Sequence, residues 1–394
     1  MKVDSAAFFY LRMPRIRDIG DGSQDACLVR LRAGRHEGWG QCEASPLPTI
    51  AAWDCPMSHS ACHPVRDSVL GKRVDSPADI RAINESVRAL SLDLLQAAHT
   101  LSGVDIALWD LLGKKMGEPV WSLLGYRKAY PKLPYASVLF GNTPRRTYER
   151  ALLIRGAGFR AAKFGWGPYG RGTVREDAAQ VHAAREGLGR EASLLIDAGT
   201  VWVDDVAAAA GRLKALKECR ARWLEEPFVS GALGSYSKLA RMSGRVGLAG
   251  GEGAHDYHMA ANLIEYGKVG FIQVDTGRIG GITTAKQVAD LAEKKGVKYV
   301  NHTFTSHLSL CASLQPYAGL RDHELCEYPV ESSVMSSALT RTRLEPGPDG
   351  FVRVPGRPGL GIAPDPAVIR RYRVPVLIRC RIRGRGSRKR QKET

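Results

Sequence analysis

The sequence lacks any apolar run that approaches the roughly 20 residues of a membrane-spanning helix. Its N-terminus, MKVDSAAFFYLRMPRIRD, also lacks the long apolar stretch of a secretory signal peptide. Only eight cysteines occur among 394 residues, too few for a disulfide-stapled scaffold, and this scarcity favours a reducing compartment. We therefore expect a cytoplasmic, globular protein with no membrane partner.

Acidic residues are in the minority, because 57 Lys and Arg face 40 Asp and Glu and give a net charge of +17. Nine of these basic residues lie in the stretch 373–394, which holds a single acid. Such a block is more often a solvated, disordered end than a specific binding arm, so we expect a disordered tail there. A regulatory or nucleic-acid-binding role of this tail is the alternative from another functional class.

The chain changes its pattern near residue 130. Before it, ACLVRLRAG and GWGQCEAS predict two short antiparallel strands, and helical periodicity follows over 77–117. Beyond it, short apolar runs alternate with helix-like segments. The runs are YASVLF, RAAKFGW, SLLIDAG, RWLEEPF, VGLAGGEG, VGFIQVDTG, KYVNHT and ELCEYP. Eight strands alternating with helices predict a TIM-type α/β barrel, whereas a doubly wound sheet would need a GxGxxG turn after its first strand.

Seven of these runs end on an ionisable residue. They are Lys163, Asp197, Glu225, Glu252, Asp275, His302 and Glu327, and from Asp197 onward they lie about 25 residues apart. Each one alone is as well explained as a helix cap or a solvated loop residue. Because the carboxyl ends of barrel strands converge on one face, the full set predicts a shared active site.

Three carboxylates, Asp197, Glu225 and Glu252, come from three consecutive predicted strands. Brought together they would repel one another unless a cation neutralised them, and ligands with only oxygen donors favour Mg²⁺. In LEEP, only one of Glu225 and Glu226 can point into the barrel, because side chains alternate along a strand. The sequence leaves open which one does.

Six motifs then occur in an ordered series: GVDIALWDLLGKKMGEPVWSLLG, IDAG, WLEEPF, GGEG, VDTGRIGG and NHTFTSHL. Together they resemble the enolase superfamily and, within it, the mandelate racemase subgroup, from about residue 2 to PGLGI at 358–362. The resemblance implies a modified TIM barrel, (β/α)7β, under an α+β capping domain built from both ends of the chain. We expect the capping domain at 1–130 and 331–372, the barrel at 131–330 and the basic tail at 373–394.

The resemblance also implies roles for single residues. Asp197, Glu225 and Glu252 match the Mg²⁺ ligands, Asp275 and His302 match a His–Asp dyad, and Glu327 matches the acid that holds a substrate carboxylate oxygen. Lys163 matches a base on the opposite face of the substrate. The implied reaction removes a proton α to a carboxylate, first of all to dehydrate an acid sugar or aldarate. Racemisation or epimerisation, or lactone cycloisomerisation, is the alternative on this scaffold, and we expect a homo-oligomer.

One position departs from the subgroup pattern. Many members have Lys-x-Lys where this chain has Ala161 and Lys163, so a cation expected beside the substrate carboxylate is missing. Lys163 then relies on burial and the metal's field to be neutral. Two roles stay open: Lys163 acts as a base, or it stays protonated and positions the substrate while His302 moves the proton.

The loop at 44–65 contains Cys55, His59, Cys62 and His63, which superficially resemble zinc ligands although the spacing is not a standard pair. We expect this loop to cover the active site, with Trp53, His59 and Arg66 as candidate substrate contacts. A plain structural loop and a zinc site are the alternatives.

Four further residues near the predicted site are candidates of a lower order. Trp166, Tyr169 and Arg171 follow Lys163 and either line the pocket or pack within their loop. His307, five residues after His302, is expected to be structural or to support the site from behind.

Overall fold

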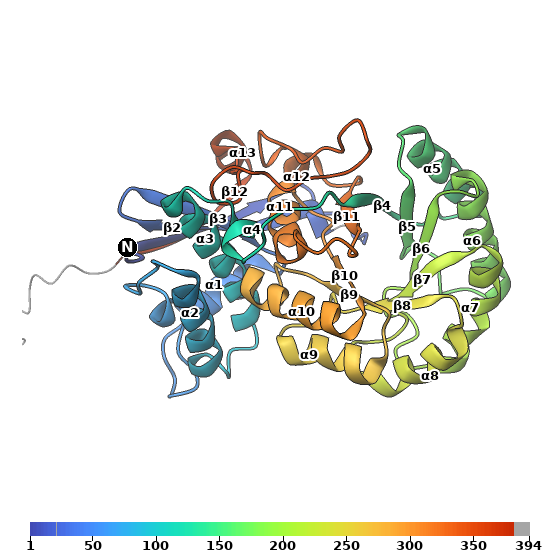
Figure 1. Ribbon diagram of the computed structural model, residues 1–394, viewed down its shortest axis with the longest axis horizontal. Coiled ribbons are helices and arrows are strands. Elements are labelled where there is room, and N and C mark those ends of the chain that lie inside the picture. Colours follow the sequence, from blue (N-terminus) through green and yellow to red (C-terminus); the bar gives the residue numbers. More distant parts are fainter. Residues whose placement is uncertain (21, 382–394) are drawn as a thin grey trace, which may run out of the picture.

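The computed structural model describes residues 1–20 and 22–381, which form two sheets. Four strands pair in the order β12-β1-β2-β3, and eight pair in the order β10-β9-β8-β7-β6-β5-β4-β11. Figure 1 shows the larger sheet curved into a barrel at the right, while the N-terminal elements and the C-terminal α13 lie together at the left. The predicted barrel with a capping domain is confirmed.

All eight predicted barrel strands are present, and every neighbouring pair in the sheet is parallel. The strands are β4 (Leu133–Leu139), β5 (Ala161–Gly165), β6 (Ser193–Asp197), β7 (Ala221–Glu225), β8 (Gly247–Gly250), β9 (Phe271–Val274), β10 (Lys298–Asn301) and β11 (Leu325–Pro329). The helices that follow the first seven strands are α5 (Pro144–Gly156), α6 (Val174–Leu188), α7 (Val206–Glu218), α8 (Leu233–Ser243), α9 (Tyr257–Asn262), α10 (Gly281–Lys295) and α11 (His307–Leu314).

An apolar layer inside the barrel determines where the polar strand ends point. Seven strands each contribute one buried side chain to it: Tyr135, Ala161, Leu195, Trp223, Ala249, Val300 and Leu325. The residue two positions later faces the same interior, one layer nearer the carboxyl end, because side chains alternate along a strand. In five of these strands that residue is ionisable: Lys163, Asp197, Glu225, His302 and Glu327.

The side chain of Asn301 closes the gap between β10 and β11, where the described barrel has no backbone ladder. In the described chain, β10 and β11 stand at the two ends of the strand order. Asn301 bridges them: its Oδ1 accepts from the backbone N–H of Glu327 at 3.1 Å, and its Nδ2 donates to the backbone oxygen of Glu327 at 3.3 Å. The hydroxyl of Tyr317 donates to the same Oδ1 at 2.8 Å. Asn301 thus replaces a missing ladder and fixes the backbone that carries Glu327.

The capping domain contains β1 (Ser5–Arg12), β2 (Asp25–Ala33), β3 (His36–Cys42), α1 (Pro46–Asp54), α2 (Pro77–Leu90) and α3 (Ala97–Met116). From the C-terminal part come α12 (Val334–Ala338), α13 (Pro366–Tyr372) and β12 (Arg373–Arg381). β12 pairs antiparallel with β1. The prediction of a disordered tail is therefore wrong for residues 373–381, whose first part, RVPVLI, supplies strand-forming residues to an open sheet edge. Residues 382–394, the rest of that predicted tail, lie outside the described residues.

Helix α3 joins the capping domain to the barrel and to the C-terminal segment. Asp105 accepts from the backbone N–H of Thr283 at 3.0 Å and from its hydroxyl at 2.5 Å, at the start of α10. Asp110 accepts from the backbone N–H of Trp39 on β3 at 2.9 Å and of Leu360 at 2.8 Å. These contacts explain why the motif that begins at Gly103 carries two buried acids.

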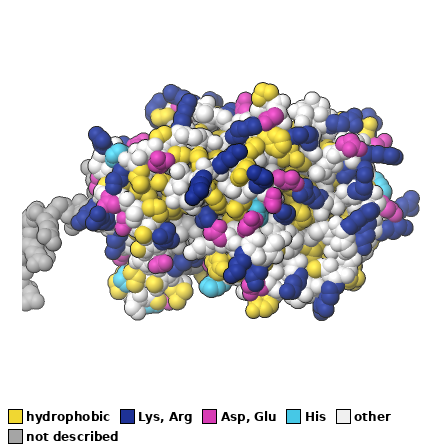
Figure 2. All heavy atoms as spheres, in the orientation of Figure 1, with side chains coloured by type: hydrophobic (Ala, Val, Ile, Leu, Met, Phe, Trp, Pro, Cys, Tyr) yellow, Lys and Arg dark blue, Asp and Glu magenta, His cyan; other side chains and the backbone are white. Residues whose placement is uncertain are grey.

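The surface gives no sign of a membrane or nucleic-acid footprint on the side in view. Among residues 1–20 and 22–381, no helix is long and apolar enough to cross a membrane. Figure 2 shows Lys and Arg scattered over this face and interleaved with Asp and Glu, whereas a nucleic-acid site gathers basic side chains into a patch or stripe. The homo-oligomer and the cytoplasmic location stay predictions.

The seam provides a stability test. Replacing Asn301 by Ala leaves both backbone groups of Glu327 without their partner in a buried setting, while the Tyr317 hydroxyl keeps the backbone oxygen of Leu325. We expect Asn301→Ala to lose about 3 kcal/mol of unfolding free energy, measured by urea denaturation. The control is Asn142→Ala, an exposed position that we expect to change little. Equal stability of the two variants would contradict the bridging role.

Candidate active site

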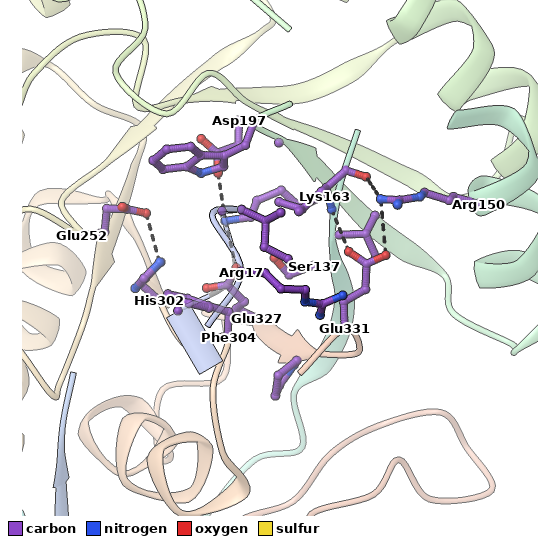
Figure 3. A pocket seen from close by; sticks show the side chains of 18 of the residues that line it. Arg17, Ser137, Arg150, Lys163, Asp197, Glu252, His302, Phe304, Glu327 and Glu331 are labelled. Carbon is purple, nitrogen blue, oxygen red and sulfur yellow. Dashed lines mark hydrogen bonds and ion pairs between the residues drawn. The ribbon is translucent and has the colours of Figure 1, made fainter. Parts of the chain in front are cut away.

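A cavity of about 750 Å³ opens at the carboxyl end of the barrel. Five of the seven predicted strand-end residues line it: Lys163, Asp197, Glu252, His302 and Glu327. Four residues of the capping domain form one side of it: Arg17, Ile19, Gly20 and Gly22. In Figure 3, Lys163 and His302 lie on different sides of this space, with Asp197 above it and Glu252 next to His302.

Lys163 lies at the centre of a buried ion cluster. Its Nζ is 2.5 Å from Glu225 Oε1, 2.8 Å from Glu327 Oε1 and 3.4 Å from Asp197 Oδ2. Burial opposes the charge on the amine, but Glu225, Glu327 and Asp197 together outweigh it and raise the pKa of Lys163 well above its usual value. The side chain is 3% exposed. The interpretation of this lysine as a solvated surface charge is therefore excluded.

His302 forms the second cationic centre. Its Nδ1 lies 2.7 Å from Asp275 Oδ2, and its Nε2 lies 3.0 Å from Glu252 Oε2 on the cavity side. Burial opposes its charge, while Glu252, Glu327 and Asp275 favour it, so the pKa of His302 is raised. Asp275 therefore holds one ring nitrogen and leaves the other facing the cavity, as a His–Asp dyad requires.

The pair of acids in LEEP separates into two roles. Glu225 points into the barrel, where its Oε2 accepts from Trp223 Nε1 at 3.0 Å and from Gln273 Nε2 at 2.8 Å. Glu226 points away and accepts from the Tyr236 hydroxyl at 2.9 Å and the backbone N–H of Gly251 at 2.7 Å. Burial raises the pKa of Glu226 to about 7. Of the two acids, Glu225 is thus the one on the inner face of the barrel, where it contacts Lys163, but it is not among the residues that line the cavity.

The charges of Asp197, Glu225 and Glu252 fit a site that needs a cation. Burial raises the pKa of Asp197 to about 6 and that of Glu225 well above its usual value, and the charge of Glu252 adds to both effects. Despite burial, the pKa of Glu252 itself is lowered, chiefly by His302 and Arg278. A positive group already lies between Asp197 and Glu225, namely Lys163. Glu252 instead pairs with His302, and among the described residues no three potential ligands converge tightly enough to hold a metal together.

Position 161 holds no second cation. Ala161 is fully buried in the apolar layer beneath Lys163, against the other inward side chains of the barrel. Lys163 therefore has carboxylates as its charged neighbours, where the subgroup pattern would add another lysine. Whether the amine works as a base or only positions the substrate stays open.

The predicted lid residues do not reach the cavity. Trp53 is fully buried, and its ring lies 5.0 Å from that of Phe8 in the capping-domain core. His59 is exposed and pairs with Asp93 at 3.1 Å, and Arg66 pairs with Asp54. Trp53 and His59 are thus not among the lining residues, and their role as substrate contacts stays a prediction. Residues 17–20 and 22, which lie between β1 and β2 in the chain, supply lining residues instead.

Of the four remaining candidates, Trp166 is among the lining residues and the other three are not. Trp166 lines the cavity, whereas Tyr169 packs against Phe140 and Arg171 is exposed outside the lining residues. His307 Nδ1 accepts from the backbone N–H of Leu344 at 3.2 Å, which supports the structural role expected for it. The zinc alternative for the loop 44–65 gains no support, since no metal-binding cluster occurs among residues 1–20 and 22–381.

Glu43 is a residue near the site that sequence reasoning missed. It follows β3, and its Oε1 accepts from the Thr305 hydroxyl at 2.6 Å, three residues after His302. Its backbone N–H donates to Gly277 at 3.0 Å, so close that a Cβ on Gly277 would lie 2.7 Å from that of Glu43. Burial and the charge of Asp275 raise the pKa of Glu43 to about 8. The acid that ends GWGQCE was the available signal.

Two family models match the chain over most of its length. Residues 147–368 match the model described as "Enolase C-terminal domain-like". Residues 22–125 match the model described as "Mandelate racemase / muconate lactonizing enzyme, N-terminal domain". The boundary between the two matches falls close to the start of β4, where the barrel begins.

Solved and curated relatives agree with this fold. The chain is similar to a crystal structure described as a "predicted Mandelate racemase from Rhodobacter sphaeroides", with a TM-score of 0.92, 54% identity and 95% of each chain covered. It is 32% identical to the 3,6-anhydro-alpha-L-galactonate cycloisomerase of Streptomyces coelicolor, over 68% of this chain and 70% of that protein. It is 30% identical to the L-talarate/galactarate dehydratase of Salmonella typhimurium, over 56% of this chain and 55% of that protein.

Glu43 gives a pH-dependent stability that can be measured. An acid whose pKa rises on folding stabilises the folded state while it is protonated, and this contribution is lost as the pH rises from 4.5 to about 8. The Glu43→Gln variant keeps an acceptor for Thr305 but cannot ionise. We expect the Tm of the native chain to fall by a few degrees more than that of the variant over this pH range. Parallel Tm curves would show that Glu43 ionises as freely as it does in the unfolded chain.

Proposed function

The chain belongs to the enolase superfamily, in its mandelate racemase-like branch, and on this premise we propose that it removes the proton α to the carboxylate of an acid sugar. We propose further that Mg²⁺ assists this step and that loss of the β-hydroxyl follows, giving a 2-keto-3-deoxy acid. The observation that carries the proposal is the His302–Asp275 pair, which faces Lys163 across a cavity walled by carboxylates.

The chain's own residues account for the proton movements. The α carbon–hydrogen bond breaks, the proton goes to Nε2 of His302 in its neutral form, and the electron pair spreads over the substrate carboxylate as an enediolate. The electron pair then returns, the bond from the β carbon to its hydroxyl breaks, and that hydroxyl takes the proton from His302 and leaves as water. The enol that remains becomes the 2-keto acid by tautomerisation. Asp275 on Nδ1 keeps the ring oriented through both transfers.

Other residues hold the substrate and the metal. The proposed role of Glu327, whose backbone is fixed by Asn301, is to donate from its protonated carboxyl group to one oxygen of the substrate carboxylate, and Lys163 lies across the cavity from His302. Asp197, Glu225 and Glu252 are the proposed Mg²⁺ ligands, because their hard oxygen donors and their need for positive charge suit that ion. When bound, Mg²⁺ would supply charge that offsets the negative charge growing on the substrate carboxylate.

Cycloisomerisation of a sugar lactone or anhydro acid is the second candidate. It is favoured by the 32% identity to a cycloisomerase, which is close to the 30% identity to a dehydratase. Both reactions begin with loss of an α proton, so the same residues serve them. They differ in the leaving group, and the products separate them.

Product analysis tests the proposal. We would incubate the protein with Mg²⁺ and a broad panel of aldonates, aldarates and their lactones, then follow 2-keto acid with semicarbazide and isomers by NMR. The expected result is a 2-keto-3-deoxy acid from at least one acid sugar. A rearranged isomer without 2-keto acid would replace dehydration by the second candidate. No product from any member of the panel would overturn both.

Substitution of the two cationic residues separates their roles. We expect His302→Asn to lower kcat about 10²- to 10⁴-fold, since the proton carrier is gone. A loss of similar size in Lys163→Ala would assign a catalytic role to the amine, and a rise in KM with kcat retained would limit it to positioning. His182→Asn, at an exposed site on α6, is the matched control and should leave the kinetics unchanged. Full activity in His302→Asn would contradict the assignment of His302 as the proton carrier.

Metal dependence can be measured both by turnover and by thermal stability. We expect EDTA to abolish turnover and added Mg²⁺ to restore it. Because an ion that binds only the folded state stabilises it, Mg²⁺ should also raise the Tm. Asp197→Asn should lose that increase, whereas Asp204→Asn, an exposed residue beyond the cavity lining, should keep it. If neither the Tm nor the turnover rate changed on addition of EDTA or Mg²⁺, the proposed ligand set would be excluded.

A further inference from the structure

The cavity extends well beyond the reacting groups. Six residues form its other end. They come from the capping domain, the end of β4, α5 and the loops after β5 and β11: Arg17, Ile19, Leu139, Arg150, Trp166 and Glu331. Figure 3 shows Arg150 and Glu331 on the side away from Glu252 and His302. A substrate that fills this space therefore meets a second set of charged side chains, distant from the proton-transferring groups.

Within this outer end, Arg150 and Glu331 neutralise each other. Arg150 Nη1 lies 3.4 Å from Glu331 Oε1 and donates to the backbone oxygen of Leu139 at 2.6 Å. Glu331 Oε2 accepts from the backbone N–H of Leu139 at 3.0 Å. The two side chains thus clamp both sides of one residue at the end of β4. Their opposite charges leave no excess charge for a ligand.

Arg17 is different, because its backbone is held while its guanidinium has no acidic partner among residues 1–20 and 22–381. The buried Gln24 side chain accepts from the backbone N–H of Arg17 at 2.6 Å and donates to its backbone oxygen at 2.8 Å. In the part of the chain that the structure describes, no carboxylate lies within ion-pair distance of the Arg17 side chain. Arg17 therefore brings a positive charge to the cavity wall from a backbone position that Gln24 holds.

We propose that the substrate carries a second anionic group at the end remote from the reacting carboxylate, and that Arg17 binds it. This inference rests on the proposed function and narrows its substrate class to acid sugars with two charged ends. A guanidinium meets a carboxylate or phosphate oxygen pair through two parallel N–H groups, which adds both affinity and orientation. The terminal hydroxymethyl group of a simple aldonate offers neither the charge nor the paired oxygens.

Matched substrates give a direct test. Each aldarate differs from an aldonate of the same configuration only in a terminal carboxylate, as galactarate differs from galactonate and glucarate from gluconate. A 6-phosphoaldonate, such as 6-phosphogluconate, replaces that carboxylate by phosphate. For every pair we would measure kcat/KM and, by calorimetry in the His302→Asn variant, the binding constant, so that affinity is read without turnover.

We expect a substrate with a charged far end to bind about 10- to 100-fold more tightly than its aldonate, the range of a charge-assisted hydrogen-bonded pair. Arg17→Met should remove this preference by raising KM for the substrate with the charged far end. The control is Arg15→Met, two residues away and outside the cavity lining, which should keep the preference. The aldarate and the 6-phosphoaldonate decide between carboxylate and phosphate as the second group.

The outcomes separate this inference from the proposed function. Equal or tighter binding of aldonates, or a preference for charged ends that survives Arg17→Met, would overturn the role of Arg17 while the proton chemistry stands. Binding that prefers a charged far end without any product from the whole panel would support Arg17 and overturn the proposed reaction.

Discussion

Four carboxylates, Asp197, Glu225, Glu252 and Glu327, lie close enough at the mouth of the barrel to affect one another's protonation, and this concentration of negative charge dominates the site. Left alone, such a group would not stay ionised in a buried place. Lys163 and His302 compensate it from two sides of the cavity. The cavity therefore favours the binding of a cation, and it suits a substrate that becomes more negative as it loses a proton. The same group of carboxylates accounts for both properties.

The capping domain also supports the active site, through contacts that extend to the residues around His302 and Asp275. Glu43 binds Thr305, in the loop that follows His302, and its backbone lies against Gly277, two residues after Asp275. Asp105 on α3 meanwhile holds the start of α10. Both members of the dyad are therefore braced by the domain that also brings Arg17 to the cavity. The position of the cap and the geometry of the proton transfer are mechanically linked.

Much of this site could be predicted from the sequence because it follows from local rules. An alternating strand pattern with a helix after each strand predicts the barrel, and the last polar residue of each strand, such as Asp197 or His302, must then face its mouth. The parts that could not be predicted depend on tertiary docking. Asn301 at the seam has no local signature, and the acid that ends GWGQCE does not show by itself that Glu43 reaches Thr305. Residues 17–20 and 22, rather than the loop 44–65, line the cavity because of how the cap sits, and β12 needs β1 as a partner before it becomes a strand.

The central claim is that His302 takes a proton from the carbon next to a carboxylate in this cavity. The most direct measurement is the incorporation of solvent deuterium at that carbon, followed by NMR in D₂O with Mg²⁺ and acid-sugar substrates, in the native chain and in His302→Asn. The account predicts that the native chain turns the substrate over with deuterium exchange or with deuterated product, and that the variant does neither. Exchange at the native rate in His302→Asn would contradict it.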